Sequence, residues 1–191
     1  MPRRTRTRRK SNLKKIIKTM IAGSQETKTI GTQINPSISD VGINYDISSL
    51  NGGTTQNARV GNAYKLTSFR LKGGVFGSDS TNLVRIIIYI PKDPTHLIDT
   101  GLQVLTPVDL DRFTVLSDRL MPTASQGPNC RLYNKVCLFN KGRRTGLNVQ
   151  FHDSTAGSIV KNRLMVYMVS DSSAVNHPSF KGWWRFYFKD A

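Results

Sequence analysis

The hydrophobic pattern of the chain changes near residue 27. Before that point, apolar residues recur at intervals of three and four, as on one face of a helix: Leu13, Ile16, Ile17, Met20 and Ile21. The pattern predicts an amphipathic helix over 12–21, which is too short to be stable alone in water. Its apolar face therefore needs a partner. Either the helix docks on its own domain, or it forms only on assembly or on nucleic acid.

From residue 27 onward, apolar and polar residues alternate with a period of two, which is typical of strands. A long excursion over 94–110 is expected to hold a short helix over 95–100, and Pro122 is expected to end its strand. The segment 163–170 is apolar on both faces, so we expect it to lie centrally. The pattern predicts eight strands, over 41–47, 64–71, 83–90, 113–121, 130–140, 147–152, 163–170 and 183–189.

None of these strands is followed by a helix that could cross over a parallel sheet. The sequence therefore predicts an all-β fold, an eight-stranded antiparallel sandwich. Its long and unequal connections favour a jelly roll over an up-and-down barrel with tight hairpins.

Charge divides the chain near the same boundary. The 191 residues include 28 basic and 12 acidic ones, for a net charge of +16. Nine basic residues and no acidic one fall in the first eighteen, a run that should be disordered when free and that suits a polyanionic partner. We divide the chain into a nucleic-acid-binding arm, 1–26, and a jelly-roll domain, 27–191. The basic residues of the arm are Arg3, Arg4, Arg6, Arg8, Arg9, Lys10, Lys14, Lys15 and Lys18.

Several other classes of protein find no support in the sequence. No apolar run reaches the roughly 18–20 residues of a membrane span, and the lysines in LKKIIKTMI argue against a secretory signal, so we expect a cytosolic or nuclear protein in the cell that makes it. His96, His152 and His177 are scattered, and no glycine-rich phosphate loop or nucleophile elbow is present. We predict no enzyme, no catalytic residue and no cofactor. Cys130 and Cys137 should point to opposite faces of one strand as buried, reduced thiols.

Six stretches of the chain resemble capsid proteins of small icosahedral viruses. They are RRKSNLKKIIKTMI, ETKTIG, NARVGNAYKLTSFRLKGGVF, NLVRIIIYIPKD, DRFTVLSDRL and FYFKDA. They resemble the single-jelly-roll coat proteins of satellite necrosis viruses and the capsid proteins of circular Rep-encoding single-stranded DNA viruses. The resemblance covers nearly the whole chain in the same order. It is most specific at RFTVLSD and does not extend to 94–110 or 122–130.

The resemblance implies a homo-oligomer, a T=1 shell of about 60 subunits with the arm inside against a single-stranded genome. The arginine-rich start favours DNA over RNA. In the satellite-virus relatives the arm helix clusters with its symmetry mates, which would make the apolar face of 12–21 an assembly face. The expected location is the virion, with assembly in the host nucleus for a DNA virus, where RRTRTRRK would also serve as a localisation signal, and in the cytoplasm otherwise.

The relatives also bind calcium between subunits through acidic side chains. Calcium needs several converging oxygen ligands, and no spacing in this sequence shows such a set. Asp79, Asp153 and Asp171 lie near predicted strand ends and are interpreted as solvated loop carboxylates. Calcium between subunits therefore stays open, with no metal ligand assigned.

Three further readings remain open. Lys141, Arg143 and Arg144 form a second candidate for nucleic-acid binding, facing either the genome or the outer surface. Trp183 is the best candidate for an anchor between subunits, unless it packs within its own domain. The competing function is a cellular nucleic-acid-binding β-domain protein, ribosomal or chromatin-like, which would stay a monomer or small oligomer without nucleic acid.

Overall fold

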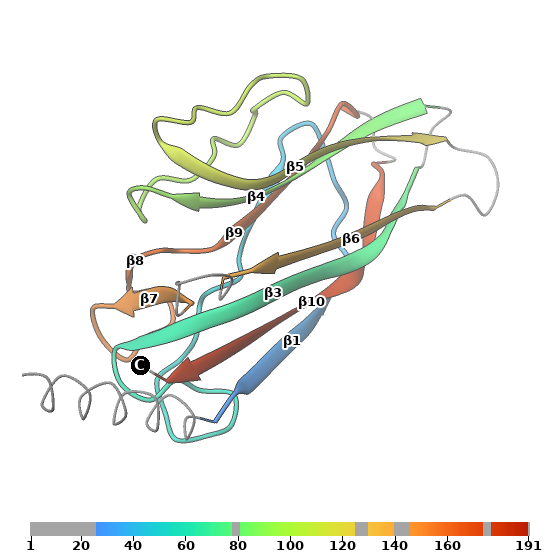
Figure 1. Ribbon diagram of the computed structural model, residues 1–191. Helices are drawn as coiled ribbons and strands as arrows, with labels where there is room; N and C mark the ends of the chain where they lie inside the picture. The colour runs from blue at the N-terminus through green and yellow to red at the C-terminus, as the bar shows by residue number, and fades with distance from the viewer. Residues whose placement is uncertain (1–25, 78–80, 125–129, 140–145, 174–176, 191) are drawn as a thin grey trace, which may run out of the picture.

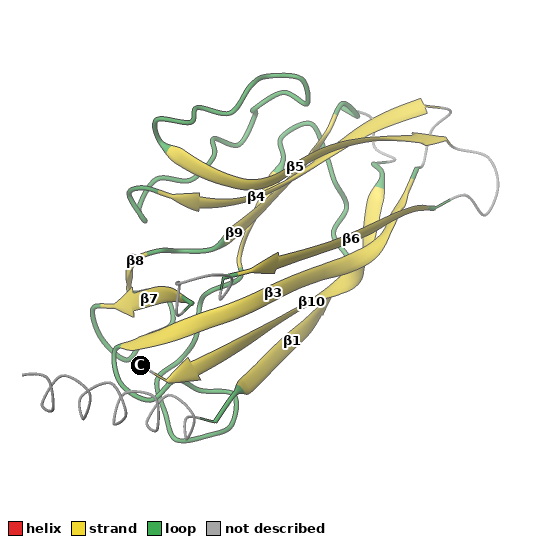
Figure 2. Cartoon of the chain, viewed as in Figure 1, coloured by secondary structure: helices red, strands yellow, loops and turns green. Residues whose placement is uncertain are grey.

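The computed structural model describes residues 26–77, 81–124, 130–139, 146–173 and 177–190. These residues form ten strands and no helix (Figures 1 and 2). The strands are β1 (Lys28–Ile34), β2 (Ile43–Asp46), β3 (Ala63–Phe76), β4 (Thr81–Pro91), β5 (Phe113–Ala124), β6 (Arg131–Leu138), β7 (Leu147–Phe151), β8 (Ile159–Lys161), β9 (Met165–Ser170) and β10 (Ser179–Asp190).

The strands form two antiparallel sheets that face each other as layers (Figure 1). The six-stranded sheet has the order β1-β10-β3-β7-β8, with β6 also paired to β3, and the four-stranded sheet has the order β2-β9-β4-β5. The first three strands of the chain alternate between the sheets, and β9 and β10 cross again near its end. This order is that of a jelly roll, which confirms the predicted fold class.

The structure has ten strands where the sequence predicted eight. Strands β6 and β7, which the sequence did predict, pair with successive parts of β3 and so occupy one interrupted position beside it in the sheet. The sequence analysis missed β1, which lies at the sheet edge and is mostly exposed, and the three-residue β8. Both strands bury too few side chains to produce a strong alternating pattern.

Two predicted strand ends and one predicted helix differ from the structure. The strand at 113–121 continues through Pro122, because β5 is an edge strand where a missing N–H need not break the ladder. Residues 95–100 form no helix; a single turn closes where the Thr95 amide donates to Asp93 Oδ1 at 2.9 Å and the His96 amide donates to the Asp93 carbonyl. The strand at 64–71 extends through Gly73 and Gly74.

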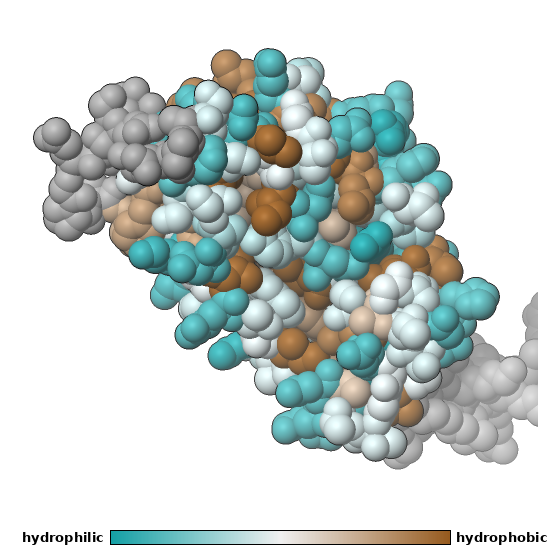
Figure 3. Space-filling view, turned by 180° about the vertical axis from the view of Figure 1, so that it is seen from behind, coloured by the Kyte–Doolittle hydropathy of each residue, from teal (hydrophilic) through white to brown (hydrophobic). Residues whose placement is uncertain are grey.

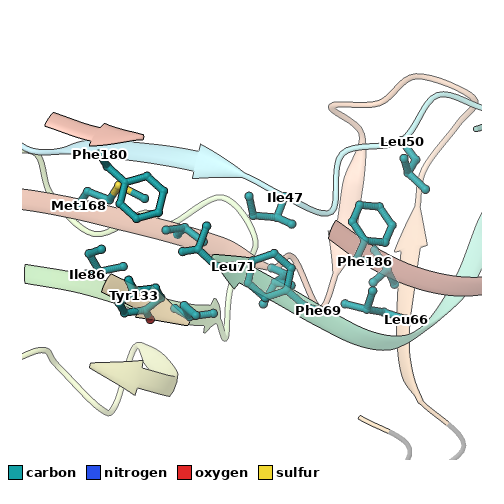
Figure 4. Packing of buried hydrophobic residues seen from close by; sticks show 14 of the residues in the cluster. Ile47, Leu50, Leu66, Phe69, Leu71, Ile86, Tyr133, Met168, Phe180 and Phe186 are labelled. Carbon is teal, nitrogen blue, oxygen red and sulfur yellow. The ribbon is translucent and has the colours of Figure 1, made fainter. Parts of the chain in front are cut away.

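The core lies between the two sheets, where side chains from both interdigitate (Figure 4). Trp184, Phe186 and Phe188 share a face of β10, and their rings follow one another at 5.5 and 5.6 Å between centroids. Every residue of β9 is buried, which confirms its predicted central position. Its second face is covered by the segment 92–112, which packs a smaller hydrophobic cluster on the outside of the four-stranded sheet.

The outside of the six-stranded sheet has no such cover among the described residues. Some apolar side chains of the described residues stay exposed. On the side of the molecule opposite to the view of Figure 1, hydrophobic residues lie in small groups among hydrophilic ones (Figure 3). Within the described part of the chain, no helix is long and apolar enough to cross a membrane. The open sheet face is therefore where the fold leaves a broad surface for a partner.

Candidate nucleic-acid interface

The outer face of the six-stranded sheet is lined with basic side chains. Along β3 and β10, alternate residues such as Leu71 and Phe186 are buried in the core, so the residues between them point outward. The outward positions of these two strands carry no aspartate or glutamate. Their basic residues, the cationic face, are Lys65, Arg70, Lys72, Lys181, Arg185 and Lys189.

Like charges stand directly opposite one another on this face. Arg70 is paired in register with Arg185, and Lys65 with Lys189. Like charges in opposed positions destabilise an antiparallel pair. A bound anion would relieve the repulsion between these opposed cations.

Elsewhere in the described chain, Lys28, Arg85 and Arg163 have carboxylate partners. Lys28 lies 2.8 Å from Asp190, and Arg163 lies 2.8 Å from Asp46. No ion pair between described residues includes Lys65, Arg70, Lys72, Lys181 or Arg185. These five side chains of the cationic face thus present their charge outward rather than pairing with a carboxylate.

Carboxylates gather on the opposite side of the sandwich. Five of the 12 acidic residues fall within 93–118, the stretch that covers or borders the outer face of the four-stranded sheet: Asp93, Asp99, Asp109, Asp111 and Asp118. They are mixed there with Lys92, Arg112 and Arg119. The two outer faces therefore differ in charge, and a polyanion would be attracted to the six-stranded side.

Aromatic rings lie among these cations. The guanidinium carbons of Arg70 and Arg185 are 5.7 and 5.4 Å from the ring centroid of Trp183, and Lys181 Nζ is 5.4 Å from that of Phe76. A groove that combines backbone-tracking cations with exposed rings is typical of surfaces that bind single-stranded nucleic acid. The arrangement can hold phosphates with the cations and bases with the rings.

The site residues predicted from the sequence lie outside the described residues. This applies to the nine basic residues of the arm, to the apolar face of 12–21, and to Lys141, Arg143 and Arg144. Their roles stay predictions. The structure does fix where the arm joins the domain, since Lys28 begins β1 opposite Phe188 at the edge of the six-stranded sheet. The arm is thus attached beside the cationic face.

Sequence analysis missed the cationic face itself. Its basic residues are present in KLTSFRLK and KGWWRFYFK, but Lys65 and Arg70 are five residues apart and share a face only because the pairing of β3 with β10 shifts between them. Each segment alone reads as an ordinary solvated strand face. The two become one surface only because β3 and β10, more than a hundred residues apart, pair side by side.

The candidate carboxylates are engaged in local hydrogen bonds. Asp153 accepts from the Thr155 amide at 2.7 Å, and hydrogen bonds from Thr155 and Ser158 lower its pKa to about 2. Asp171 accepts from the Leu83 amide at 2.9 Å. Among the described residues, no group of three histidine, cysteine or acidic side chains could hold a metal ion, and Asp79 lies outside them. Calcium between subunits stays a prediction.

The two cysteines are free, as predicted, but both are half-buried rather than buried. They also do not share a strand, since Cys130 precedes β6 and Cys137 lies within it. Burial raises the pKa of the Cys137 thiol, which keeps it protonated and unreactive.

Comparison with solved structures finds similarity to viral proteins. No protein-family model matches the chain, and no curated protein matches it. A structure of Desmodium yellow mottle tymovirus is 7% identical with a TM-score of 0.43, and covers 86% of both chains. The 60-mer BFDV capsid protein is 12% identical with a TM-score of 0.36, over 87% of this chain and 92% of that one. The human polyomavirus 6 VP1 pentamer is 8% identical with a TM-score of 0.26, over 87% and 94%.

These neighbours are of the kind that the sequence resemblance predicted. At such identities the likeness concerns the fold alone, and the jelly-roll assignment comes from the strand order itself.

Proposed function

We propose that this protein is a viral capsid protein that assembles into a small T=1 icosahedral shell of about 60 copies and packages a single-stranded genome. The observation that carries this proposal is the cationic face on one side of a jelly-roll domain, at whose edge a strongly basic arm is attached. Arm and face both supply positive charge, as the inner surface of a nucleic-acid container requires.

Packaging has a direct physical basis. Basic side chains that displace counterions from phosphates bind nucleic acid regardless of its sequence. The arm supplies nine charges on a tether, and the face supplies six on a rigid sheet. The arginine content of the arm favours single-stranded DNA, with assembly in the host nucleus; an RNA genome would place assembly in the cytoplasm.

A cellular nucleic-acid-binding protein is the second candidate, because the same cationic face would serve it equally well. The two candidates differ in assembly. A capsid protein closes into shells through heterologous contacts, whereas a ribosomal or chromatin-like protein stays a monomer or small oligomer without nucleic acid.

Negative-stain microscopy of the full chain tests the proposal, together with the ratio of absorbance at nucleic-acid and protein wavelengths after nuclease treatment. We expect uniform spherical particles that hold nuclease-protected nucleic acid. Deletion of 1–21 should empty or abolish them. A variant with all nine basic residues of the arm changed to Gln keeps the length of the arm. It therefore distinguishes loss of the positive charge from loss of the segment itself. A monodisperse small species that binds nucleic acid without closing into shells would refute the capsid proposal in favour of the cellular protein.

A further inference from the structure

Two neighbouring tryptophans of β10 have different surroundings. Trp184 points into the sandwich, where its ring stacks on Phe186 at 5.5 Å and 11° between planes. Trp183 points outward onto the cationic face, where it is opposite Lys72 of β3 and Gln33 of β1. A large ring on an open, polar sheet face is expected to have a partner that covers it.

The surface beside Trp183 is hollowed on both sides. One hollow of about 430 Å³ is lined by Thr29, Gly31, Gln33, Trp183 and Arg185. A second, of about 390 Å³, is lined by Gln33, Asn35, Lys181, Gly182 and Trp183. Both volumes fall in the range of small-molecule sites, so a planar base can enter beside the ring.

Glycine keeps the first hollow open. Gly31 of β1 is paired with Arg185, and a Cβ at this position would lie 3.0 Å from the Trp184 carbonyl oxygen. A larger residue would narrow the hollow next to the Trp183 ring. The edge strand thus leaves one side of the ring accessible from solvent.

Three cations surround the same ring. Arg70 and Arg185, which are opposite each other in register, place their guanidinium carbons 5.7 and 5.4 Å from its centroid. Lys72 is the cross-strand neighbour of Trp183. A guanidinium binds phosphate oxygens through paired hydrogen bonds, while an indole face stacks on a base of any sequence.

From this geometry we propose that Trp183 is a base-stacking platform for single-stranded nucleic acid, with Arg70, Arg185 and Lys72 holding the phosphates that flank the stacked base. The proposal rests on the proposed function, in that the chain must bind nucleic acid. It assigns Trp183 to the genome rather than to contacts between subunits. Its direct cross-strand neighbours favour this role, because Lys72 and Gln33 are polar, whereas the core of a protein interface is apolar.

The test uses the full chain and oligothymidylate or oligouridylate of about 20 nucleotides, with an abasic strand of the same length as a backbone-only probe. The variants are Trp183→Leu, which removes the ring, and Trp183→Phe, which keeps a smaller one. Tyr187→Leu is the matched control, because Tyr187 is an exposed ring on the same strand and face, and no guanidinium of the described residues lies over it.

We expect Trp183→Leu to weaken binding of the oligonucleotide at least about fivefold, the lower end for loss of one stacked base, and to leave abasic-strand binding unchanged. Trp183→Phe and Tyr187→Leu should lose less. Binding should also quench tryptophan emission in the native protein, and Trp183→Phe should abolish the quenching because only Trp184 then remains. The quenching requires no destabilising variant, so the proposal stays testable even if Trp183→Leu fails to fold.

Other outcomes distinguish failure of the proposed function from failure of the stacking site at Trp183. A native protein that binds neither oligonucleotide nor abasic strand would overturn the proposed function. Tight binding with no quenching and no loss in Trp183→Leu would overturn the stacking site alone. Unchanged binding combined with lost particle formation in Trp183→Leu would overturn it as well, and would make Trp183 an anchor between subunits.

Discussion

At the residue scale, Arg59 shows how a buried charge organises a loop. It is fully buried, and its guanidinium donates to the backbone carbonyls of Leu50, Gly61, Asp153 and Thr155 while lying 3.7 Å from the Phe151 ring centroid. These contacts tie the glycine-rich loop before β3 to the turn after β7. Carbonyl acceptors held this way keep two irregular segments at fixed positions against the core.

Replacing this guanidinium should be costly. We expect Arg59→Met to lower the free energy of unfolding by about 3 kcal/mol, because buried carbonyls lose their donors. Urea denaturation followed by tryptophan fluorescence measures the change. Arg112→Met is the matched control, since that exposed guanidinium also faces a ring, at 5.5 Å from Phe113, and should change stability by less than about 0.5 kcal/mol. Equal effects of the two variants would contradict the role given to Arg59.

The turn that receives Arg59 should confer a pH dependence. Hydrogen bonds from Thr155 and Ser158 lower the pKa of Asp153 from 3.8 to about 2. Between those values the unfolded chain binds more protons than the folded one, so stability rises with pH across that window. The ionised carboxylate therefore stabilises the fold above 3.8, and this contribution is lost as the pH falls toward 2.

We expect Asp153→Asn to be less stable than the native protein near neutral pH, and the difference to vanish as the pH approaches about 2. Thermal unfolding at a series of pH values measures both proteins. A difference that stays constant across the series would show that the charge of Asp153 is not what stabilises the turn.

At the scale of elements, Arg85 ties the segment 92–112 to the four-stranded sheet, beside the apolar cluster that packs there. Arg85 of β4 donates to both carboxylate oxygens of Asp118 on β5, at 2.8 and 2.6 Å, and to the carbonyls of Val104 and Thr106. The hydrogen bonds to Asp118 raise the pKa of Arg85. One side chain thus joins two strands to the segment that covers them.

Arg85→Leu should release this segment while the rest of the sandwich stays folded. We expect faster hydrogen exchange at the amides of 98–108 and little change in β3 and β10, because local opening follows the loss of local contacts. Arg119→Leu, an exposed arginine on the adjacent strand β5, is the control and should leave exchange in 98–108 unchanged. Uniform acceleration across both sheets would instead indicate that the pair supports global stability.

The elements also show what a sequence can predict. Alternation located β4, β7 and β10, because those strands bury one face and their periodicity is strong. A continuous apolar run located β9, and long unequal connections identified the jelly roll. Alternation failed at β1 and at Pro122, where an edge strand relaxes the rules that burial imposes. The cationic face was invisible for another reason. Cross-strand opposition of Arg70 and Arg185 depends on the register of strands far apart in the chain.

At the scale of the whole molecule, positive charge has two sources: the basic residues of the arm in the sequence, and the cationic face on the six-stranded sheet. Salt dependence separates them. With roughly −0.7 per neutralised phosphate, the nine arm charges predict a slope near −6 for log affinity against log salt, and the six face charges add about −4. The full chain should therefore show a slope between about −6 and −10.

If the cationic face binds the same nucleic-acid strand as the arm, neutralising the arm alone should leave a measurable slope of log affinity against log salt. We expect about −4 for the variant with all nine arm residues changed to Gln, and about −6 for a variant with the six face residues changed to Gln instead. The control changes Lys92, Arg112 and Arg119 to Gln on the other side of the sandwich and should leave the slope near that of the native chain. Fluorescence titration of an oligothymidylate of about 30 nucleotides at several salt concentrations measures all four proteins.

The measured slopes distinguish between ways in which nucleic acid contacts the protein. A slope near zero without the arm charges would mean that the arm alone carries the nucleic acid and that the sheet face contacts something else. A full-chain slope shallower than about −2 would exclude the arm as the main contact. Slopes that add would mean that nucleic acid lies against the sheet itself, with its backbone held at fixed positions on β3 and β10 while the arm neutralises the remaining phosphates. Order in the packaged strand would then follow from the register of two protein strands rather than from the sequence of the genome.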